Sequence, residues 1–483
     1  MNATVGSILL SLKQMLLRLF AALLLSAQVY VAHAQMNMTL LAKWNNPNLP
    51  KVDGDQIWND LIGWHDTVNN REYIITGTGD SIYFFDITNP SNPVLCDVEK
   101  GRATGAVNRD FETYSHYVYT VSDRSTTPGS LQIFDMQYLP DSVSKVYDND
   151  TFSINTHTLF IEPSRERMYL CGNAHKPAGM RSMAIFSLAN PLSPAYLGEI
   201  PKSEGCAYTH EMYARNDTAF LSCGYEGLYI YDVRNAAAPV QLGSILPPYP
   251  QNGYNHSSWL DSSGKFLLFT DENQGLGIKM YDISDIRNPD FITVFNSNVG
   301  ALPHNAYWKG RFAYVSSYED GVVVYDLQNP KSLKFKQPPL AGWYDTYTLN
   351  PTGVYNGFHG CWGVWPFLPS GVIVASDMSE GIFILQPSPT LRVDENMATL
   401  VHSSVYPNPF SAVTQLTIHS LTTQEVTLRI FDQTARLISE RVVELGQGGT
   451  QIELNELIPF PSGLYHIRLE NNRQRIYHHV IKN

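Results

Sequence analysis

The sequence of 483 residues has a formal net charge of −12, with 45 Asp and Glu against 33 Lys and Arg. A chain of this length holds two or three domains, and its acidic balance argues against nucleic acid and other polyanions as partners. Tyr, Phe, Gly and Pro are spread over the whole chain and no long capped helical pattern stands out, which predicts an all-β protein of many short strands.

The N-terminus has the pattern of a secretory signal peptide. Two basic residues precede an apolar run over residues 19–31, and the small-residue sequence AHA stands immediately before Gln35. We therefore predict a signal peptide over residues 1–34, and export of the chain. The alternative, an uncleaved membrane anchor, is disfavoured because the apolar run is shorter than the ~20 residues that a membrane-spanning helix needs.

Internal repetition is the most informative feature of the sequence. Each repeat is an apolar strand ending in an aromatic residue and Asp, usually followed by an Asn-Pro turn, and the copies end at Asp86, Asp135, Ser187, Asp232, Asp282, Asp326 and Gln386. The intervals of 49, 52, 45, 50, 44 and 60 residues are typical of the four-stranded blades of a β-propeller. A second apolar strand precedes each copy, so the two should form a hairpin. The Asp should accept hydrogen bonds from the N–H groups of the following turn.

One four-stranded sheet cannot bury both of its faces, whereas sheets stacked radially cover one another in a closed ring. We therefore predict a seven-bladed β-propeller over residues 35–387. The segment from Thr39 to Trp44 resembles the strand that follows each repeat. It is expected to supply the outer strand of the last blade and so to close the ring.

Five cysteines are widely spaced along the chain: Cys96, Cys171, Cys206, Cys223 and Cys361. An odd number leaves at least one unpaired. Cys171 and Cys223 lie in the similar sequences LCGN and SCGY, so both are expected to be small buried strand residues. A core of this size does not need a disulfide framework, and none is expected.

Beyond the repeats, residues 388–403 are interpreted as a linker and residues 404–483 as a separate module. The module has alternating strands and no helical pattern, which predicts a small β-sandwich. It contains the sequences SVYPNPF, IFDQTARLI and PSGLYHIRL and ends in RIYHHVIKN. The residues that we single out as its motif are Tyr406, Pro407, Asn408, Pro409, Gly463 and Tyr465.

These sequences closely resemble the type A sorting domain of the type IX secretion system of Bacteroidetes. Ala435 departs from the pattern, because that family usually has Gly there. The resemblance implies that the type IX secretion machinery recognises the domain at the outer membrane and that the domain is then removed. The rest of the chain would be released or anchored to surface lipopolysaccharide, so we expect a secreted or cell-surface protein.

The repeats resemble the choice-of-anchor B family, whose propellers carry LVIVD-type repeats. The match rests on FFDITNPSNPV, on IYDVRNAAAPV, on THE and PHN around His210 and His304, and on GFHGCWGVWPFLPSG over residues 357–371. That family joins one exported domain to varied surface anchors. The resemblance implies no settled activity.

Five histidines recur in phase with the repeat, at intervals of 53, 46, 48 and 55 residues: His157, His210, His256, His304 and His359. In the first two units the equivalent places are held by Asn59 and Asp60 and by Arg109 and Asp110. Each lies just before the first strand of its unit, which in propellers lines the central channel. We therefore expect these side chains to converge near one mouth of the channel.

Converging imidazoles, completed by Asp60, Asp110 and Glu211, would bind a polar ligand or a divalent metal cofactor. The alternative is a structural latch, in which each His hydrogen-bonds to the backbone of the neighbouring blade. The sequence has no GxSxG, HExxH, P-loop or CxxC pattern.

The leading functional hypothesis is a surface binding module for a glycan, a peptide or a protein. The competing hypothesis is a metal-dependent hydrolase or lyase that uses the histidine ring. A third, a purely structural component of the cell surface, predicts no deep polar pocket, and histidine side chains more than ~10 Å apart, too far to share one ion, would favour it.

Overall fold

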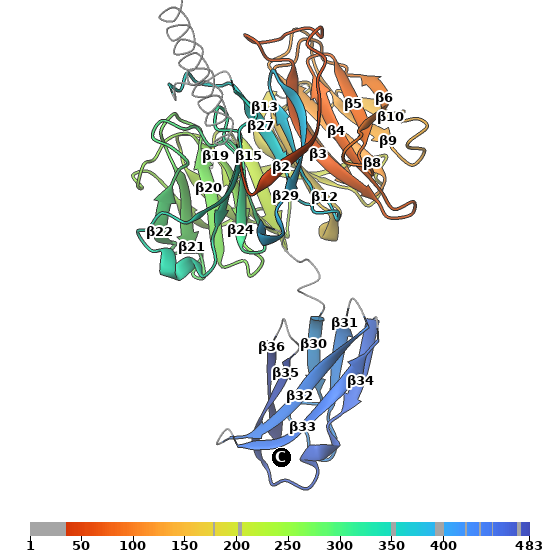
Figure 1. The fold of residues 1–483 in the computed structure, drawn as a ribbon, viewed down its shortest axis with the longest axis vertical. Coiled ribbons are helices and arrows are strands. Elements are labelled where there is room, and N and C mark those ends of the chain that lie inside the picture. Colours follow the sequence, from red (N-terminus) through yellow and green to blue (C-terminus); the bar gives the residue numbers. More distant parts are fainter. Residues whose placement is uncertain are drawn as a thin grey trace, which may run out of the picture. The chain divides into compact units, whose positions relative to one another are not determined.

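The computed structural model describes residues 35–176, 179–200, 205–348, 354–391, 400–420, 423–433, 436–446, 448–470 and 475–483. The predicted signal peptide, residues 392–399 of the predicted linker and Ala435 lie outside the described residues. The chain divides after residue 392 into two compact units, here called the propeller unit and the C-terminal unit. Strands make up nearly all the regular structure of both units (Figure 1). Within the described part, no helix has the length and apolar character needed to span a membrane.

The described residues of the propeller unit form seven antiparallel sheets, which confirms the predicted all-β, propeller-like class. In chain order the first four sheets are β3 (Trp58–Asp66), β4 (Arg71–Thr78), β5 (Ser81–Asp86) and β6 (Val94–Lys100); β7 (Asn108–Tyr114), β8 (Tyr117–Asp123), β9 (Leu131–Asp135) and β10 (Ser144–Asn149); β11 (Thr158–Glu162), β12 (Arg167–His175), β13 (Gly179–Ser187) and β14 (Ala195–Ile200); and β15 (Glu211–Arg215), β16 (Thr218–Ser222), β17 (Leu228–Asp232) and β18 (Val240–Ile245). The other three are β19 (Asn255–Leu260), β20 (Phe266–Asp271), β21 (Ile278–Asp282) and β22 (Asp290–Phe295); β23 (Ala306–Lys309), β24 (Phe312–Ser316), β25 (Val322–Asp326) and β26 (Leu340–Tyr344) with β1 (Gln35–Met36); and β27 (Cys361–Trp365), β28 (Ile373–Asp377) and β29 (Gly381–Pro387) with β2 (Met38–Trp44). The described short 3₁₀ helices are η1 (Pro163–Arg165), η2 (Pro330–Leu333), η3 (Pro389–Leu391) and, in the C-terminal unit, η5 (Asn455–Leu457).

The hydrophobic core lies between the sheets, not within any one of them. Ile185 of the third sheet packs in one cluster with Leu221 of the fourth. Ile74 of the first sheet packs in another with Val374 of the seventh. The first strands β3, β7, β11, β15, β19 and β23 contact one another in succession, and β27 of the seventh sheet contacts β3. The sheets therefore cover one another around a closed ring, as radial stacking requires.

The repeated Asp residues cap the turns that follow their strands. The Asp86 carboxylate accepts a hydrogen bond from Thr88 N at 2.8 Å, and the same contact two residues on is made by Asp135, Asp232, Asp282 and Asp326, at 2.9–3.0 Å. The predicted role of these carboxylates as turn acceptors is confirmed. Each satisfies a backbone donor that the strand ladder leaves free.

The N-terminal strand closes the ring. β2 pairs antiparallel with β29, with Leu40 opposite Leu385 and Trp44 opposite Ile382, which confirms the predicted outer strand of the last sheet. We call this strand the clasp. The Trp44 ring packs edge-on against Trp58 of the first sheet, at 5.5 Å between ring centroids, and against Phe85 at 4.8 Å. The clasp therefore joins the seventh sheet to the first by both backbone and aromatic contacts.

Truncating Trp44 should loosen this closure. We expect Trp44→Ala to lower the free energy of unfolding by about 2–4 kcal/mol, somewhat below the cost for a fully buried Trp, because Trp44 is partly buried. Thr39→Ala, at an exposed position of the same strand, should cost less than about 0.5 kcal/mol. Urea denaturation followed by Trp fluorescence and circular dichroism measures both. Equal losses in the two variants would contradict the role of the clasp.

The cysteines depart from the sequence-based expectation at one point. Cys223 is buried as expected, but it forms a disulfide with Cys206, 17 residues earlier. Cys96, Cys171 and Cys361 are free, and Cys171 is a buried strand residue as predicted. The pairing was not visible in the sequence, because Cys206 precedes the first strand of the fourth sheet and Cys223 follows its second strand. Antiparallel pairing of β15 with β16 brings these two ends together.

This disulfide closes a short loop beside the first strand of the fourth sheet. In the chain-entropy model such a crosslink contributes about 3 kcal/mol, so Cys206→Ser with Cys223→Ser should lower stability by roughly that amount. The unreduced denatured protein should have three titratable thiols and the reduced protein five. Five thiols before reduction would show that the bridge does not form.

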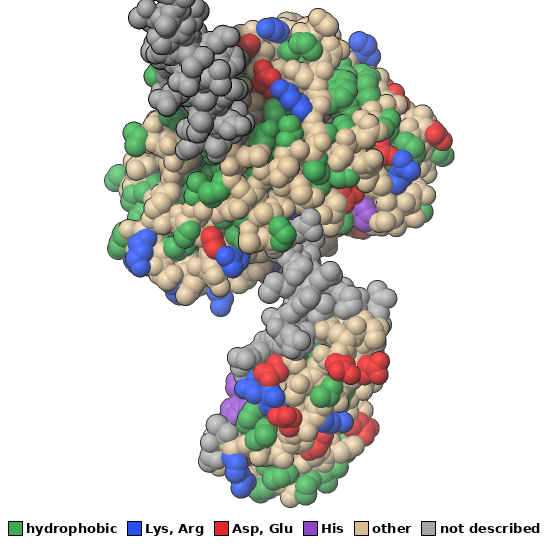
Figure 2. Space-filling model, viewed as in Figure 1, with side chains coloured by type: hydrophobic (Ala, Val, Ile, Leu, Met, Phe, Trp, Pro, Cys, Tyr) green, Lys and Arg blue, Asp and Glu red, His purple; other side chains and the backbone are tan. Residues whose placement is uncertain are grey.

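The C-terminal unit consists of two antiparallel sheets. One is β30 (Leu400–Tyr406), β31 (Gln415–Ser420) and β34 (Gly448–Glu453), and the other is β33 (Leu437–Leu445), β32 (Gln424–Asp432), β35 (Gly463–Glu470) and β36 (Arg475–Lys482). Buried side chains of both sheets, such as Ile418, Ile430 and Ile467, form a single core. In the view of Figure 2 acidic and basic side chains are interspersed over the surface of each unit.

Candidate functional site

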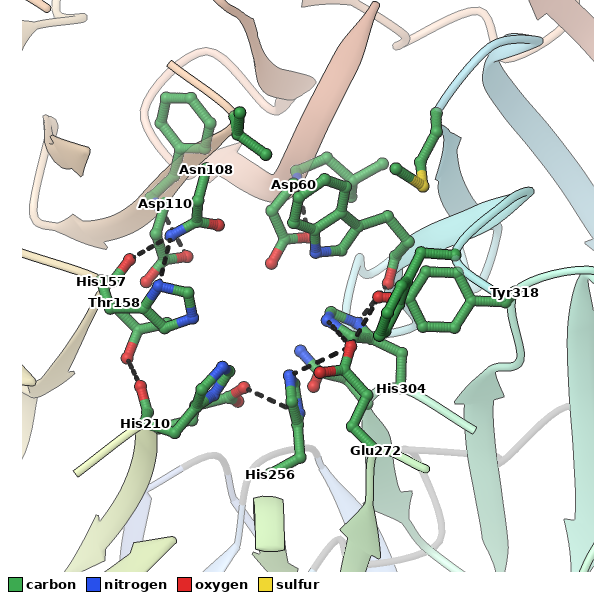
Figure 3. Close-up of a pocket in the computed structure, with 18 of the residues that line it drawn as sticks. Asp60, Asn108, Asp110, His157, Thr158, His210, His256, Glu272, His304 and Tyr318 are labelled. Atoms are coloured by element: carbon green, nitrogen blue, oxygen red, sulfur yellow. Dashed lines mark hydrogen bonds and ion pairs between the residues drawn. The ribbon is translucent and has the colours of Figure 1, made fainter. Parts of the chain in front are cut away.

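A cavity of about 420 Å³ lies where the first strands of the sheets begin (Figure 3). In the third, fourth and sixth sheets a His stands at or just before the start of the first strand, and His256 is the second residue of β19. Because the first strands surround the axis of the ring, their starts converge. The repeated position in the sequence thus becomes a ring of side chains facing one space.

Four of the five predicted histidines form a continuous row along the cavity wall. The ring centroids of His157 and His210 are 4.0 Å apart, those of His210 and His256 4.2 Å, and those of His256 and His304 4.3 Å. The four histidines are therefore not more than ~10 Å apart, the separation that would have favoured a purely structural surface component. The row can offer several nitrogen ligands to one small ligand or ion.

Hydrogen bonds fix the two ends of the row. His157 Nδ1 lies 2.8 Å from Asp123 Oδ2, and His304 Nδ1 lies 2.7 Å from the carbonyl oxygen of Trp362 in the seventh sheet. The second contact is the blade-to-blade bond that the latch hypothesis describes. It occupies one nitrogen of His304 and leaves Nε2 facing Glu272, at 3.7 Å from Oε1.

Burial disfavours the charged form of three imidazoles of the row, those of His210, His256 and His304. It lowers the pKa of His304 to about 3 and lowers the pKa values of His210 and His256 well below their usual range. The neighbouring imidazoles add to the effect for His210, because positive charges on adjacent rings would repel. Nδ1 of His210 is buried and has no hydrogen-bond partner. Neutral imidazole is the form that ligates metals and accepts hydrogen bonds.

Carboxylates from several sheets complete the cavity. Asp60 accepts a hydrogen bond from Leu61 N at 2.7 Å, and Asp110 accepts one from Leu159 N of the next sheet at 2.7 Å. Burial raises the pKa of Asp60 to about 6. Burial, together with the charge of Asp60, raises the pKa of Asp110 well above its usual range. These groups therefore offer both protonated and ionised oxygens near neutral pH.

Glu211 and Glu272 lie against the histidine row. His256 stands between them, with Nδ1 3.7 Å from Glu211 Oε2 and Nε2 3.7 Å from Glu272 Oε1. With its nitrogen turned toward these groups, the Asn305 amide donates to Glu211 Oε2 at 3.1 Å. Burial raises the pKa of Glu272 to about 7, an effect partly offset by the Tyr318 hydroxyl, which donates to Oε1 at 2.6 Å.

Two predicted residues differ from the rest in their placement. His359 borders the cavity but stands outside the row: it lies 3.2 Å from Asp55 Oδ1 and stacks on Tyr347. Arg109 is not among the lining residues. Its guanidinium donates to the carbonyl oxygens of Thr78, Gly79 and Ala103 at 3.1–3.2 Å, and burial lowers its pKa to about 10. Arg109 therefore ties the first sheet to the second.

Glu272, Glu112 and Tyr318 are functional candidates that the sequence analysis missed. Glu272 directly follows β20, whose last residue Asp271 stands opposite Asn255, next to His256. The signal was present in the sequence, because antiparallel pairing brings the end of each second strand to the start of the first. A search for polar residues at both ends of each hairpin would have found Glu272.

Two overlapping groups of side chains have ligand atoms close enough to hold a metal ion. They are His210 with Glu211 and His256, and His256 with Glu272 and His304, and within each group the ligand atoms lie within 4.8 Å of one another. Nitrogen and carboxylate oxygen are the ligands of zinc and related divalent ions. The same atoms can also bind the hydroxyl groups of a polar organic ligand.

The motif of the C-terminal unit is held against the last strand. Asn408 Nδ2 donates to the carbonyl of His479 at 2.8 Å, and Asn408 Oδ1 accepts from Ile481 N at 2.9 Å. Phe410 is buried and its N–H donates to the Ile481 carbonyl. Tyr406, by contrast, is 80% exposed, and the Tyr465 hydroxyl donates to the carbonyl of Pro461. The YPNPF segment and the C-terminal tail thus form one structural element.

Solved structures similar to this chain have low sequence identity. The crystal structure of Chaetomium thermophilum Raptor has 15% identity and a TM-score of 0.49 and covers 71% of this chain, which spans only 29% of Raptor. The Pseudomonas aeruginosa periplasmic gluconolactonase PpgL has 11% identity, a TM-score of 0.47 and coverage of 82% and 99% of the two chains. U3-55K has 11% identity, a TM-score of 0.49 and coverage of 72% and 98%.

No curated protein sequence matches this chain. A family model does match the C-terminal unit, over residues 404–483, and it describes the secretion system C-terminal sorting domain. This match confirms the sequence-based assignment of the module and implies interaction with the type IX secretion machinery. Residues 404–483 are therefore a secretion system C-terminal sorting domain, which directs export by type IX secretion to the cell surface or outer membrane.

Proposed function

We propose that this protein is a cell-surface or secreted binding module whose propeller holds a small polar ligand, such as one unit of a glycan or the end of a peptide, in its axial cavity. The observation that carries the proposal is the convergence of four histidines and several buried carboxylates on one cavity of about 420 Å³. A concave site with a few converging polar groups is the usual form of a small-ligand site. The binding residues in this proposal are His157, His210, His256, His304, His359, Asp60 and Asp110.

The composition of the cavity wall supports a neutral, hydroxyl-rich ligand. Trp259, Trp362, Trp365 and Tyr307 line the cavity beside the polar groups. Aromatic faces pack against the C–H faces of sugar rings, while imidazole and carboxyl groups hydrogen-bond to the hydroxyls. Asp53 and Arg124, which also line the cavity, are largely exposed and form an ion pair at 3.2 Å.

The proposal includes the organisation of the chain. A signal peptide over residues 1–34 would be removed, and the propeller over residues 35–387 would be joined by a linker, residues 388–403, to the sorting domain. The repeats, with their turn-capping Asp residues, support membership of the choice-of-anchor B family in Bacteroidetes. After sorting, the propeller would be released or anchored to lipopolysaccharide.

A metal-dependent hydrolase or lyase is the second candidate. It is favoured by one observation: Glu272 lies 3.7 Å from the Nε2 atoms of both His256 and His304, a separation that suits ligands of one ion. A bound ion would polarise a carbonyl or activate a water molecule.

The binding proposal is tested by filling the cavity at a position outside both candidate metal groups. A panel of monosaccharides, uronic acids and dipeptides is screened by thermal shift, and hits are quantified by calorimetry. We expect His157→Phe to weaken binding at least about tenfold, because it removes a polar contact worth about 1–2 kcal/mol. His116→Phe, in the turn between β7 and β8 and outside the cavity lining, is the matched control. Unchanged affinity in His157→Phe, or no ligand in the panel, would count against the proposal.

Sorting is tested by mass spectrometry of cell-surface and culture fractions. We expect peptides from residues 35–387 in these fractions and peptides from residues 404–483 to be depleted there. A chain truncated after residue 403 should remain inside the cell envelope. Tail peptides that are as abundant as propeller peptides at the surface would contradict removal of the domain.

A further inference from the structure

His256, Glu272 and His304 stand together at the junction of the fifth and sixth sheets (Figure 3). Glu272 Oε1 is 3.7 Å from Nε2 of His256 and 3.7 Å from Nε2 of His304. The side chains of the two histidines are 2% and 5% exposed and that of Glu272 is 13% exposed. Two imidazole nitrogens and one carboxylate oxygen, atom types that bind zinc, thus face one another in a largely buried part of the cavity wall.

These separations are too long for hydrogen bonds and suit atoms that share an ion. A hydrogen bond between nitrogen and oxygen spans about 2.7–3.2 Å. Ligand atoms each about 2.1 Å from a zinc ion, separated by an angle of roughly 110–120°, stand about 3.4–3.6 Å apart. Both His–Glu distances of 3.7 Å are too long for the first arrangement and within about 0.1 Å of the second.

The outer hydrogen bonds of the group orient two of the ligands. His304 Nδ1 lies 2.7 Å from the carbonyl of Trp362, which can only accept, so Nδ1 carries the proton and Nε2 keeps its lone pair. Glu272 Oε1 accepts from the Tyr318 hydroxyl at 2.6 Å. Metal-ligating histidines and carboxylates are typically held by such partners, which fix the tautomer and the direction of the lone pair.

From this geometry we infer that His256 Nε2, Glu272 Oε1 and His304 Nε2 bind one divalent transition-metal ion, with zinc as the best fit. Two imidazoles and one carboxylate form a three-ligand set that leaves a further coordination position for water or a ligand. This inference deepens the proposed function and rests on it in one respect: the open position would serve the ligand of the same cavity.

The neighbouring group of His210, Glu211 and His256 competes for the same histidine, through its Nδ1 atom. Its histidine His210 has no hydrogen bond at Nδ1 to set its tautomer. The group with Glu272 is better prepared, because the protein already orients both His304 and Glu272. Variants of His210 therefore distinguish the two groups.

The test measures binding of Zn²⁺ alone to the purified full chain, stripped with chelator and dialysed. Calorimetry and elemental analysis should give one ion per chain, and Co²⁺ in its place should give the visible absorption of a four- or five-coordinate site. Glu272→Gln with His304→Gln should weaken Zn²⁺ binding by more than about 100-fold, because losing an outer partner alone costs about 10–100-fold. Tyr318→Phe, which removes only such a partner, should weaken it about tenfold.

His210→Gln tests the competing group, and the matched control is His116→Gln, in the turn between β7 and β8 and outside the cavity lining. Both variants should keep one Zn²⁺ with an affinity within about threefold of the parent chain. Circular dichroism and melting temperature check that each variant is folded, and the single variant His304→Gln replaces the double variant if that one is not. No bound Zn²⁺ in the parent chain, or full affinity in Glu272→Gln with His304→Gln, would overturn the inference.

The two proposals fail separately. Zn²⁺ binding that persists in His157→Phe, with no organic ligand found, would leave the metal site standing and remove the binding function. Conversely, a chain that takes up no Zn²⁺ when the ion is added, but binds an organic ligand with the same affinity in its presence and absence, would remove the metal site. The binding function would then remain.

Discussion

Closure of the ring by the clasp is the constraint on which the rest of the structure depends. Each sheet has two apolar faces and buries them only against its neighbours, so an open array would expose one face at each end. Pairing of β2 with β29, and packing of Trp44 on Trp58, removes both ends at once. The seventh sheet contains both the clasp and the last three strands of the propeller, and its strand β27 contacts β3 of the first sheet. The position of the central cavity therefore depends on a strand whose residues pair with residues 338–349 positions later in the chain.

The residues that stabilise the ring and the residues that line its cavity occupy different places in each sheet. The clusters of buried apolar side chains lie between successive sheets, whereas the histidines and carboxylates stand where the first strands begin. A polar group that is buried without good partners destabilises a fold, so such groups are tolerated only where other contacts offset them. Here the packing between sheets supplies that stability. The cavity wall can consequently hold buried histidines and carboxylates that do not themselves stabilise the fold.

Most of the fold could be predicted from the sequence because its repeat reports local geometry. The aromatic-Asp ending marks a strand and its turn, and the interval between copies marks one sheet. These two signals were enough to predict the all-β propeller class, the pairing of the clasp with the last sheet, and the turn contacts of Asp86 and its equivalents. The site was predicted in part. The phase of the histidines indicated convergence. The direction of the Arg109 side chain, which is buried between the first two sheets, and the Cys206–Cys223 disulfide depend instead on side-chain conformation and on hairpin pairing. Neither of these is encoded in spacing alone.

Opposed pKa shifts allow so many ionisable groups to share one buried space. A carboxyl whose pKa is raised by folding, such as Glu272 from 4.5 to about 7, contributes stability that is lost as the pH rises through that interval. An imidazole whose pKa is lowered, such as His304 from 6.5 to about 3, contributes stability that is gained over nearly the same interval. The two effects oppose each other between about pH 4.5 and 6.5. A wall of acids alone, or of histidines alone, would make folding depend steeply on pH, and the mixture reduces that dependence while keeping neutral donors and acceptors in the cavity.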